Sequence, residues 1–348
     1  MLAIKRSEIK NLLLKLAEKN EVFAPIKPTE GESFFEKFFP ESELDLDYET
    51  TKNPAKRIFF PAEEKIFSFN KIENKIIACP DGGKSGSANK KEILLFGINT
   101  RDTEALIQLD EIMKRPEKDF FYFQKRSAAT IISIVNENGA IPHAGVDLVL
   151  EKVDGELYKA LAITEKGRKI TSLGFFSKIQ EARWEEKKEA LAMPELRKML
   201  KDPEKLKDVV RWSWKSMPKF WEDLGKKCLG CGICTYVCPL CHCFSTEDTC
   251  ELNGKKCFKS RKWAACTLPE FATVTGSLPS QAGHDFHPSI KERYYNWFFH
   301  KFVRGYKEFG KSQCVACGRC KKYCPAGIDI EKILLELNEK YDSSRDKA

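Results

Sequence analysis

The residues of this chain best suited to redox chemistry are its 14 cysteines, most of which lie in two short segments. Each segment has the spacing C-x2-C-x2-C-x3-C-P, and closely spaced thiolates of this kind bind the irons of a [4Fe-4S] cubane. The two runs consist of Cys228, Cys231, Cys234 and Cys238, and of Cys314, Cys317, Cys320 and Cys324. The spacing therefore predicts two iron–sulfur clusters.

The fourth cysteine of each run stands directly before a proline and is expected to bind the cluster of the other run. This crossed arrangement needs two complete runs, so their joint presence is a specific signal. The predicted ligands of cluster 1 are Cys228, Cys231, Cys234 and Cys324, and those of cluster 2 are Cys314, Cys317, Cys320 and Cys238.

Zinc and disulfides explain the same residues less well. A structural zinc site uses two cysteine pairs or a mixture of cysteine and histidine, so the third closely spaced cysteine of each run would be surplus. Disulfides require an oxidising compartment, and Lys5, Arg6 and Lys10 interrupt the apolar N-terminal stretch that a signal peptide would need. We expect a cytoplasmic protein.

The composition argues against nucleic-acid and membrane binding. The formal charge of +8 omits the clusters, and two oxidised cubanes of about −2 each reduce it to roughly +4. No basic nucleic-acid-binding module is visible, and no apolar run approaches the length of a membrane span.

The chain is predicted to have an α+β fold in three parts. Residues 1–190 are expected to form a mixed α/β docking module without metal, because Cys79 is their only cysteine. Residues 191–225 should form a helical connection, with breaks at Met193-Pro194 and Met217-Pro218. Residues 226–348 should form a dicluster [4Fe-4S] ferredoxin-like domain with a long insertion at 244–313.

Hydrophobic patterns predict the individual elements. Helices are expected over 7–18 from Ser7, after a capping Asp102, over 290–309 and over 330–341. Strands are expected at 21–26, 57–60, 65–69, 93–98, 120–124, 129–135, 146–153 and 157–163.

The remaining cysteines of the C-terminal half suggest a third cluster. Pro239 should turn Cys241 and Cys243 away from the first cubane, toward Cys266 in the insertion. His284 is our preferred fourth ligand, since histidine replaces cysteine on some clusters; Cys250 and Cys257 are the alternatives. The other reading is a buried patch of plain thiols. The sequence around His143, His287 and His300 is typical of surface or structurally satisfied histidines.

Motifs along nearly the whole chain resemble one family. The chain is similar to the beta subunit of archaeal cytoplasmic sulfhydrogenases, which are nickel–iron hydrogenases, and to the dicluster ferredoxin subunit of anaerobic sulfite reductase. The motifs that carry this resemblance are Val22–Pro25, Phe59–Phe69, Phe96–Asp102 with Leu109-Asp110, Trp221, Cys238–Phe244, Arg261–Cys266, Gly283–Phe286 and Cys314–Pro325.

This resemblance implies an electron-transfer subunit of a hetero-oligomer. Such subunits relay electrons between a flavoprotein subunit, which holds FAD and uses NAD(P)H, and a hydrogenase or reductase catalytic subunit. No G-x-G-x-x-G run, the pattern typical of dinucleotide binding, follows a predicted strand. We therefore expect the flavin and the nicotinamide to bind to another subunit. Two alternatives stay open, a catalytic sulfur-reducing subunit with an open cluster at Cys241/Cys243/Cys266, and an adaptor with structural clusters. Relatives also carry N-terminal cysteines, but Arg101 occupies the position of one of them, so an N-terminal cluster is not expected.

Overall fold

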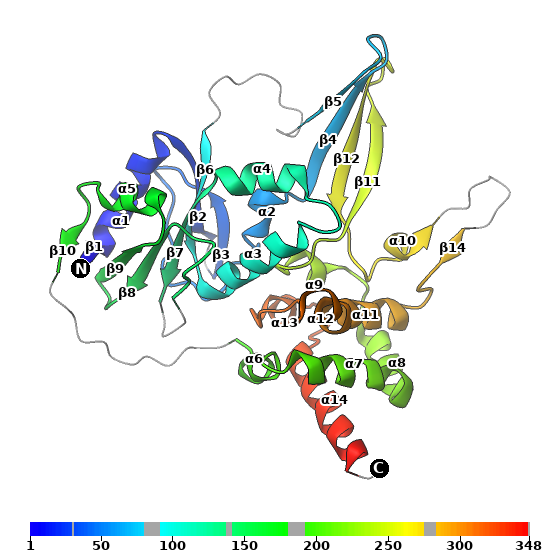
Figure 1. Ribbon diagram of the computed structural model, residues 1–348. Helices are drawn as coiled ribbons and strands as arrows, with labels where there is room; N and C mark the ends of the chain where they lie inside the picture. The colour runs from blue at the N-terminus through cyan, green and yellow to red at the C-terminus, as the bar shows by residue number, and fades with distance from the viewer. Residues whose placement is uncertain (30, 80–90, 137–140, 180–191, 275–282, 347–348) are drawn as a thin grey trace. The chain divides into compact units, whose positions relative to one another are not determined.

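The computed structural model describes residues 1–29, 31–79, 91–136, 141–179, 192–274 and 283–346 (Figure 1). The chain forms two compact units, of which the first comprises Met1–Pro61 and Cys79–Ala190 and the second comprises Ala62–Ala78 and Leu191–Ala348. Helices and strands are both abundant, and the cysteine runs lie in a separate C-terminal part, which confirms the predicted α+β class. The boundary predicted at residues 190/191 lies outside the described residues.

Unit 1 is built on an eight-stranded sheet with the order β10-β1-β9-β8-β7-β6-β2-β3. The strands β2, β6, β7 and β8 run parallel, and antiparallel strands extend the sheet on both sides. Its strands are β1 (Leu2–Lys5), β2 (Asn20–Thr29), β3 (Glu32–Lys37), β6 (Glu92–Ile98), β7 (Thr130–Val135), β8 (Leu148–Lys152), β9 (Leu157–Ala162) and β10 (Ser177–Lys178). Its helices are α1 (Arg6–Ala17), α2 (Lys56–Phe59), α3 (Thr100–Ile112), α4 (Phe120–Ala128) and α5 (Glu165–Thr171).

The core of unit 1 follows from the apolar faces of these elements. Every residue of β7 is buried, as expected for a central parallel strand covered on both faces. Helix α1 buries Ile9, Leu12 and Leu13 at helical spacing against the sheet core. Most predicted strands and the helix near the N-terminus are thus confirmed.

Two predicted strands of unit 1 are helices instead. Of the residues 57–60, the first three lie in α2 and Phe60 follows its end, and residues 120–124 open α4. The apolar run after residue 119 suggested a strand, but the Asp119 side chain accepts a hydrogen bond from the backbone N–H of Tyr122 and starts a helix. The predicted caps also differ, because α1 begins at Arg6 and Asn99 rather than Asp102 caps α3.

Unit 2 combines a four-stranded ribbon with a helical bundle. The ribbon has the order β11-β12-β4-β5, so a hairpin from the first third of the chain pairs with one from the last third (Figure 1, blue beside yellow). The strands are β4 (Glu63–Asn70), β5 (Lys75–Ala78), β11 (Phe244–Cys250), β12 (Lys256–Trp263), β13 (Thr273–Val274) and β14 (His284–Asp285). The helices are α6 (Pro194–Met199), α7 (Pro203–Ser216), α8 (Pro218–Lys227), α9 (Ile233–Tyr236), α10 (Pro269–Ala272), α11 (Ile290–Phe298), the π-helix η1 (Phe299–Arg304), α12 (Gly305–Phe309), α13 (Arg319–Lys322) and α14 (Ile330–Arg345).

Prolines and aromatic residues organise the bundle. Pro194, Pro203 and Pro218 each occupy the first turn of a helix, where a missing N–H costs nothing. Trp221 is fully buried, packs edge-on against Phe298, and donates its indole N–H to Ser213. This places α8 against α11, directly before the first cysteine run. Among the described helices, none is long and apolar enough to cross a membrane.

Candidate metal centre

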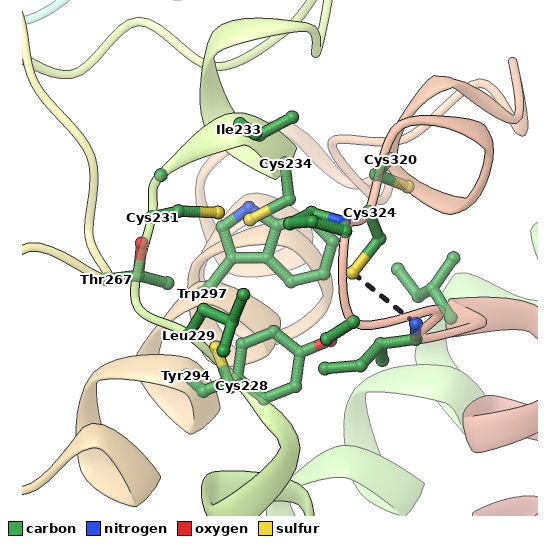
Figure 2. Close-up of a pocket in the computed structure, with 15 residues that line it drawn as sticks. Cys228, Leu229, Cys231, Ile233, Cys234, Thr267, Tyr294, Trp297, Cys320 and Cys324 are labelled. Carbon is green, nitrogen blue, oxygen red and sulfur yellow. Dashed lines mark hydrogen bonds between the residues drawn. The ribbon is translucent and has the colours of Figure 1, made fainter.

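The four cysteines predicted for cluster 1 line one pocket of unit 2. Cys228, Cys231 and Cys234 approach from the first run and Cys324 from the second, with Tyr294 and Trp297 beside them (Figure 2). The Cys324 sulfur accepts a backbone N–H from Ile328 at 3.4 Å, the dashed contact of Figure 2. The fold therefore brings together the residues that the crossed pattern assigns to one cluster.

The four cysteines predicted for cluster 2 line a second pocket. Cys238 reaches it from the first run, and the other three come from the second, Cys314, Cys317 and Cys320. Cys320 and Ile330 line both pockets. The two cysteine sets are consequently neighbours in the structure.

Each of the two cysteine runs has a glycine with a left-handed backbone conformation after its second cysteine. Gly232 and Gly318 follow the second cysteine of each run with φ of 76° and 78°, a left-handed conformation that glycine adopts at little cost. A Cβ on Gly232 would lie 2.9 Å from the Cβ of Ala265, and one on Gly318 would lie 2.8 Å from the Cβ of Ala192. Each glycine lets the chain reverse into a short helix, α9 or α13, that carries the third cysteine.

The raised pKa values of the buried thiols indicate that these pockets need a positive charge to hold thiolates. Burial raises the pKa of Cys234 to about 12 and that of Cys314 to about 11, and neighbouring thiols add to the effect. Thiolates at these positions need a local positive charge. Iron supplies that charge and holds cysteine as thiolate, so the donor set fits a cubane.

Two buried hydrogen-bond donors beside the cluster 1 cysteines also fit a bound cubane. The indole Nε1 of Trp297 and the hydroxyl of Thr267 have no hydrogen-bond partner among the described residues, and both residues line this pocket. An unsatisfied buried donor costs about 1–3 kcal/mol. The sulfides and thiolates of a bound cubane would accept these hydrogen bonds, so the pocket fits the group.

A buried cation lies beside the cluster 2 cysteines. The ammonium of Lys301 is 3.0 Å from the sulfur of Cys238 and 3.3 Å from the carbonyl oxygen of Gln313. Burial alone would lower the pKa of Lys301, but the surrounding thiols, Cys238 foremost, raise it well above its usual value. This lysine remains charged, next to a predicted cluster ligand.

The cysteines of unit 2 outside the two runs separate into three groups. Cys243 and Cys266 lie 3.6 Å apart, sulfur to sulfur, beside His300. A hydrogen bond from the Cys243 thiol lowers the pKa of Cys266. Cys241 is hydrogen-bonded to Cys238, and this contact and burial raise its pKa. Cys250 and Cys257 form a cross-strand disulfide between β11 and β12, contrary to the expectation of reduced thiols, and neither offers a free ligand.

The histidine beside Cys243 and Cys266 is not the one chosen from sequence. His284 is exposed in β14 and packs edge-on against Phe286, outside the group. His300, which sequence reasoning treated as a plain surface or structural histidine, takes the place beside the two thiols. Lys301 and Trp297 were also missed. The only sequence signal for Trp297, His300 and Lys301 was the aromatic helix predicted over 290–309. In the structure this helix begins as α11 and continues as the π-helix η1. Such π-helical stretches are frequent at functional sites.

Comparison with known proteins agrees with this geometry. Residues 227–328 match the family described as 4Fe-4S dicluster domain. The chain is 27% identical to sulfhydrogenase 2 subunit beta of Pyrococcus furiosus over 344 residues, which cover 93% of this chain and 94% of that protein. No solved structure matches the chain at a significant level.

These matches confirm the resemblance inferred from the motifs. The chain contains a 4Fe-4S dicluster domain, and the protein carries two [4Fe-4S] clusters. The assignment of individual cysteines to the two clusters remains a proposal, supported by the two pockets.

Proposed function

We propose that this chain is the electron-transfer subunit of a cytoplasmic, hetero-oligomeric hydrogenase of the sulfhydrogenase type. It relays electrons between a flavoprotein subunit, which holds FAD and reacts with NAD(P)H, and the catalytic subunit. The ligands are Cys228, Cys231, Cys234 and Cys324 for cluster 1, and Cys314, Cys317, Cys320 and Cys238 for cluster 2.

The observation that carries this proposal is the proximity of the two cysteine-lined pockets. Because Cys320 and Ile330 line both, two clusters bound in these pockets would be close neighbours. A pair of clusters so placed suits a relay. Similarity along 93% of the chain to a sulfhydrogenase subunit supports the host complex, and the need for reduced thiolates supports a cytoplasmic location.

Co-purification tests the partners. The tagged full-length chain, isolated anaerobically from its native cells, should bring down a flavoprotein and a hydrogenase catalytic subunit in stoichiometric amounts, identified by mass spectrometry. Untagged cells carried through the same purification are the control. Recovery of a sulfite reductase catalytic subunit in place of the hydrogenase would overturn the assignment and favour the anaerobic sulfite reductase.

Assays of the isolated chain test the relay. With both clusters in place it should accept electrons from dithionite, but show no NAD(P)H oxidation, hydrogen uptake or sulfite reduction. Turnover of any of these substrates by the chain alone would show a catalytic subunit rather than a relay.

A further inference from the structure

Cys243, Cys266 and His300 form a group with the spacing of metal ligands. The two sulfurs and one ring nitrogen of the histidine all lie within 4.8 Å of one another. The sulfurs are 3.6 Å apart. Two thiolates bound to one tetrahedral zinc ion, with Zn–S bonds of about 2.3 Å, stand about 3.8 Å apart, so the observed separation fits ligation of a single ion.

The backbone holds the two cysteines in this position. Cys243 directly precedes β11, and Cys266 lies three residues after β12. The ladder between these strands pairs Phe244 with Trp263, and the N–H of Ala264 donates to the carbonyl oxygen of Cys243 at 3.0 Å. The thiols therefore meet at the base of a paired hairpin, a rigid support of the kind that metal ligands require.

The ring of His300 contacts the side chain of Arg304. Its Nε2 lies 3.1 Å from a guanidinium nitrogen of Arg304. Arginine has only donors, so Nε2 accepts in this contact and presents a lone pair, as a metal ligand must. The side chain of Arg304 is more than half exposed and also bonds Glu308, so it can withdraw when an ion binds.

We propose that Cys243, Cys266 and His300 bind a single zinc ion, distinct from the two iron–sulfur clusters. Soft thiolate and imidazole donors in tetrahedral spacing are typical of zinc. Binding displaces the two thiol protons to solvent. Two thiolates then neutralise the divalent ion, so the site adds no net charge near the ammonium of Lys301.

The geometry argues against a third cubane at this position. Each cysteine of a cubane binds a different iron, which sets its sulfurs farther apart than two ligands of one ion. Cys241, which was predicted as a ligand of that third cluster together with His284, is instead hydrogen-bonded to Cys238. The three residues leave one coordination position for water or an exogenous ligand, the arrangement of an open zinc site.

Metal analysis of the full-length protein with its clusters tests the site. We expect about eight irons for two cubanes and, in addition, one zinc per chain. His300→Gln and Cys266→Ser should reduce zinc at least tenfold and leave both cluster EPR signals intact. His284→Gln, a change of the exposed histidine, is the matched control and should retain zinc.

Cobalt provides an independent readout. The protein loaded with Co²⁺ in place of zinc should show thiolate-to-cobalt charge transfer and the strong visible bands of a tetrahedral ion, and His300→Gln should abolish them. Zinc below a tenth of an ion per chain without cobalt binding would overturn the proposal. So would about twelve irons per chain, or variants that keep the ion. The EPR signals report folding in every variant, and His300→Gln keeps the test valid if Cys266→Ser does not fold.

Discussion

The ammonium of Lys301 lies 3.0 Å from the sulfur of Cys238, and both side chains are buried. Cys238 is the residue by which the first run reaches the pocket of the second. A positive charge at this point favours the reduced cluster, because reduction adds negative charge to it. Hydrogen bonds and charges at the sulfurs are among the main determinants of cluster potential.

Lys301→Met is therefore expected to lower the reduction potential of cluster 2. A charge-assisted hydrogen bond is worth about 1.5–3 kcal/mol, and a one-electron potential shifts about 59 mV for each 1.4 kcal/mol, so the change should be on the order of 60–130 mV. Potentiometric titration followed by EPR measures it. Lys307→Met, which removes an exposed lysine of α12, is the control and should leave the potential unchanged. An unaltered cluster 2 potential in Lys301→Met would contradict the electrostatic role.

Loss of the Trp297 indole N–H is expected to lower the reduction potential of cluster 1, by less than the loss of Lys301 lowers that of cluster 2. Trp297→Phe removes a buried N–H that has no partner in the described part of the chain, and keeps an aromatic ring in the pocket. A neutral hydrogen bond contributes about 0.5–1.5 kcal/mol, so the potential of cluster 1 should fall by roughly 20–60 mV. Cluster 2 in the same molecule is the internal reference. Equal shifts of both potentials would indicate a general disturbance rather than a lost hydrogen bond.

Local patterns in the sequence account for the cysteine runs and for most elements. The spacing of each run is a local property, and the crossed sets it predicts do line common pockets. The helix starts at Pro194 and Pro218 follow from proline's fixed φ. In contrast, the strand predicted at 120–124 failed because one capping side chain, Asp119, outweighed the β preference of the aromatic residues that follow.

Long-range pairing could not be deduced in this way. His300 meets Cys243 and Cys266 only because η1 returns to the base of the β11–β12 hairpin, and no local pattern distinguishes it from His284. The same holds for Lys301 and for the pairing of β4 with β12, which joins residues nearly 200 positions apart. Burial decides these contacts, and burial of single polar residues leaves no periodic signal.

The pairing of β4 with β12 includes a buried ion pair whose loss should destabilise the ribbon. Arg261 contacts Glu64 at 2.7 and 2.9 Å, and their side chains are only 4% and 1% exposed. Removing one partner takes the opposite charge of this ion pair away from a buried group, at a cost of about 3–5 kcal/mol. At about 2–4 °C per kcal/mol, Glu64→Leu and Arg261→Met should each lower the thermal midpoint by roughly 6–20 °C.

The double variant Glu64→Leu/Arg261→Met completes a mutant cycle for this pair. It should recover much of the loss, because apolar residues replace both charges. Thermal unfolding followed by circular dichroism under anaerobic conditions measures all three variants. Losses that simply add in the double variant would show that the two residues act independently.

Crossed ligation predicts which single substitutions share a phenotype. Cys324→Ser should damage the same cluster as Cys231→Ser, although the two residues stand in different runs, because both line the cluster 1 pocket. Cys238→Ser should likewise match Cys317→Ser, because both line the other pocket. Serine is a poorer iron ligand than thiolate, so each variant should lose one EPR signal of the reduced protein and part of its iron.

The pairing of these phenotypes is the test, since it requires no prior assignment of either signal. Cys79→Ser, a change of the cysteine in unit 1, should keep both signals and all iron. If Cys324→Ser instead matches Cys317→Ser, and Cys238→Ser matches Cys231→Ser, each run holds its own cluster. The short distance from Cys324 to the Cys228–Cys234 run would then be a feature of packing, and the route between the clusters would have to be assigned to other residues.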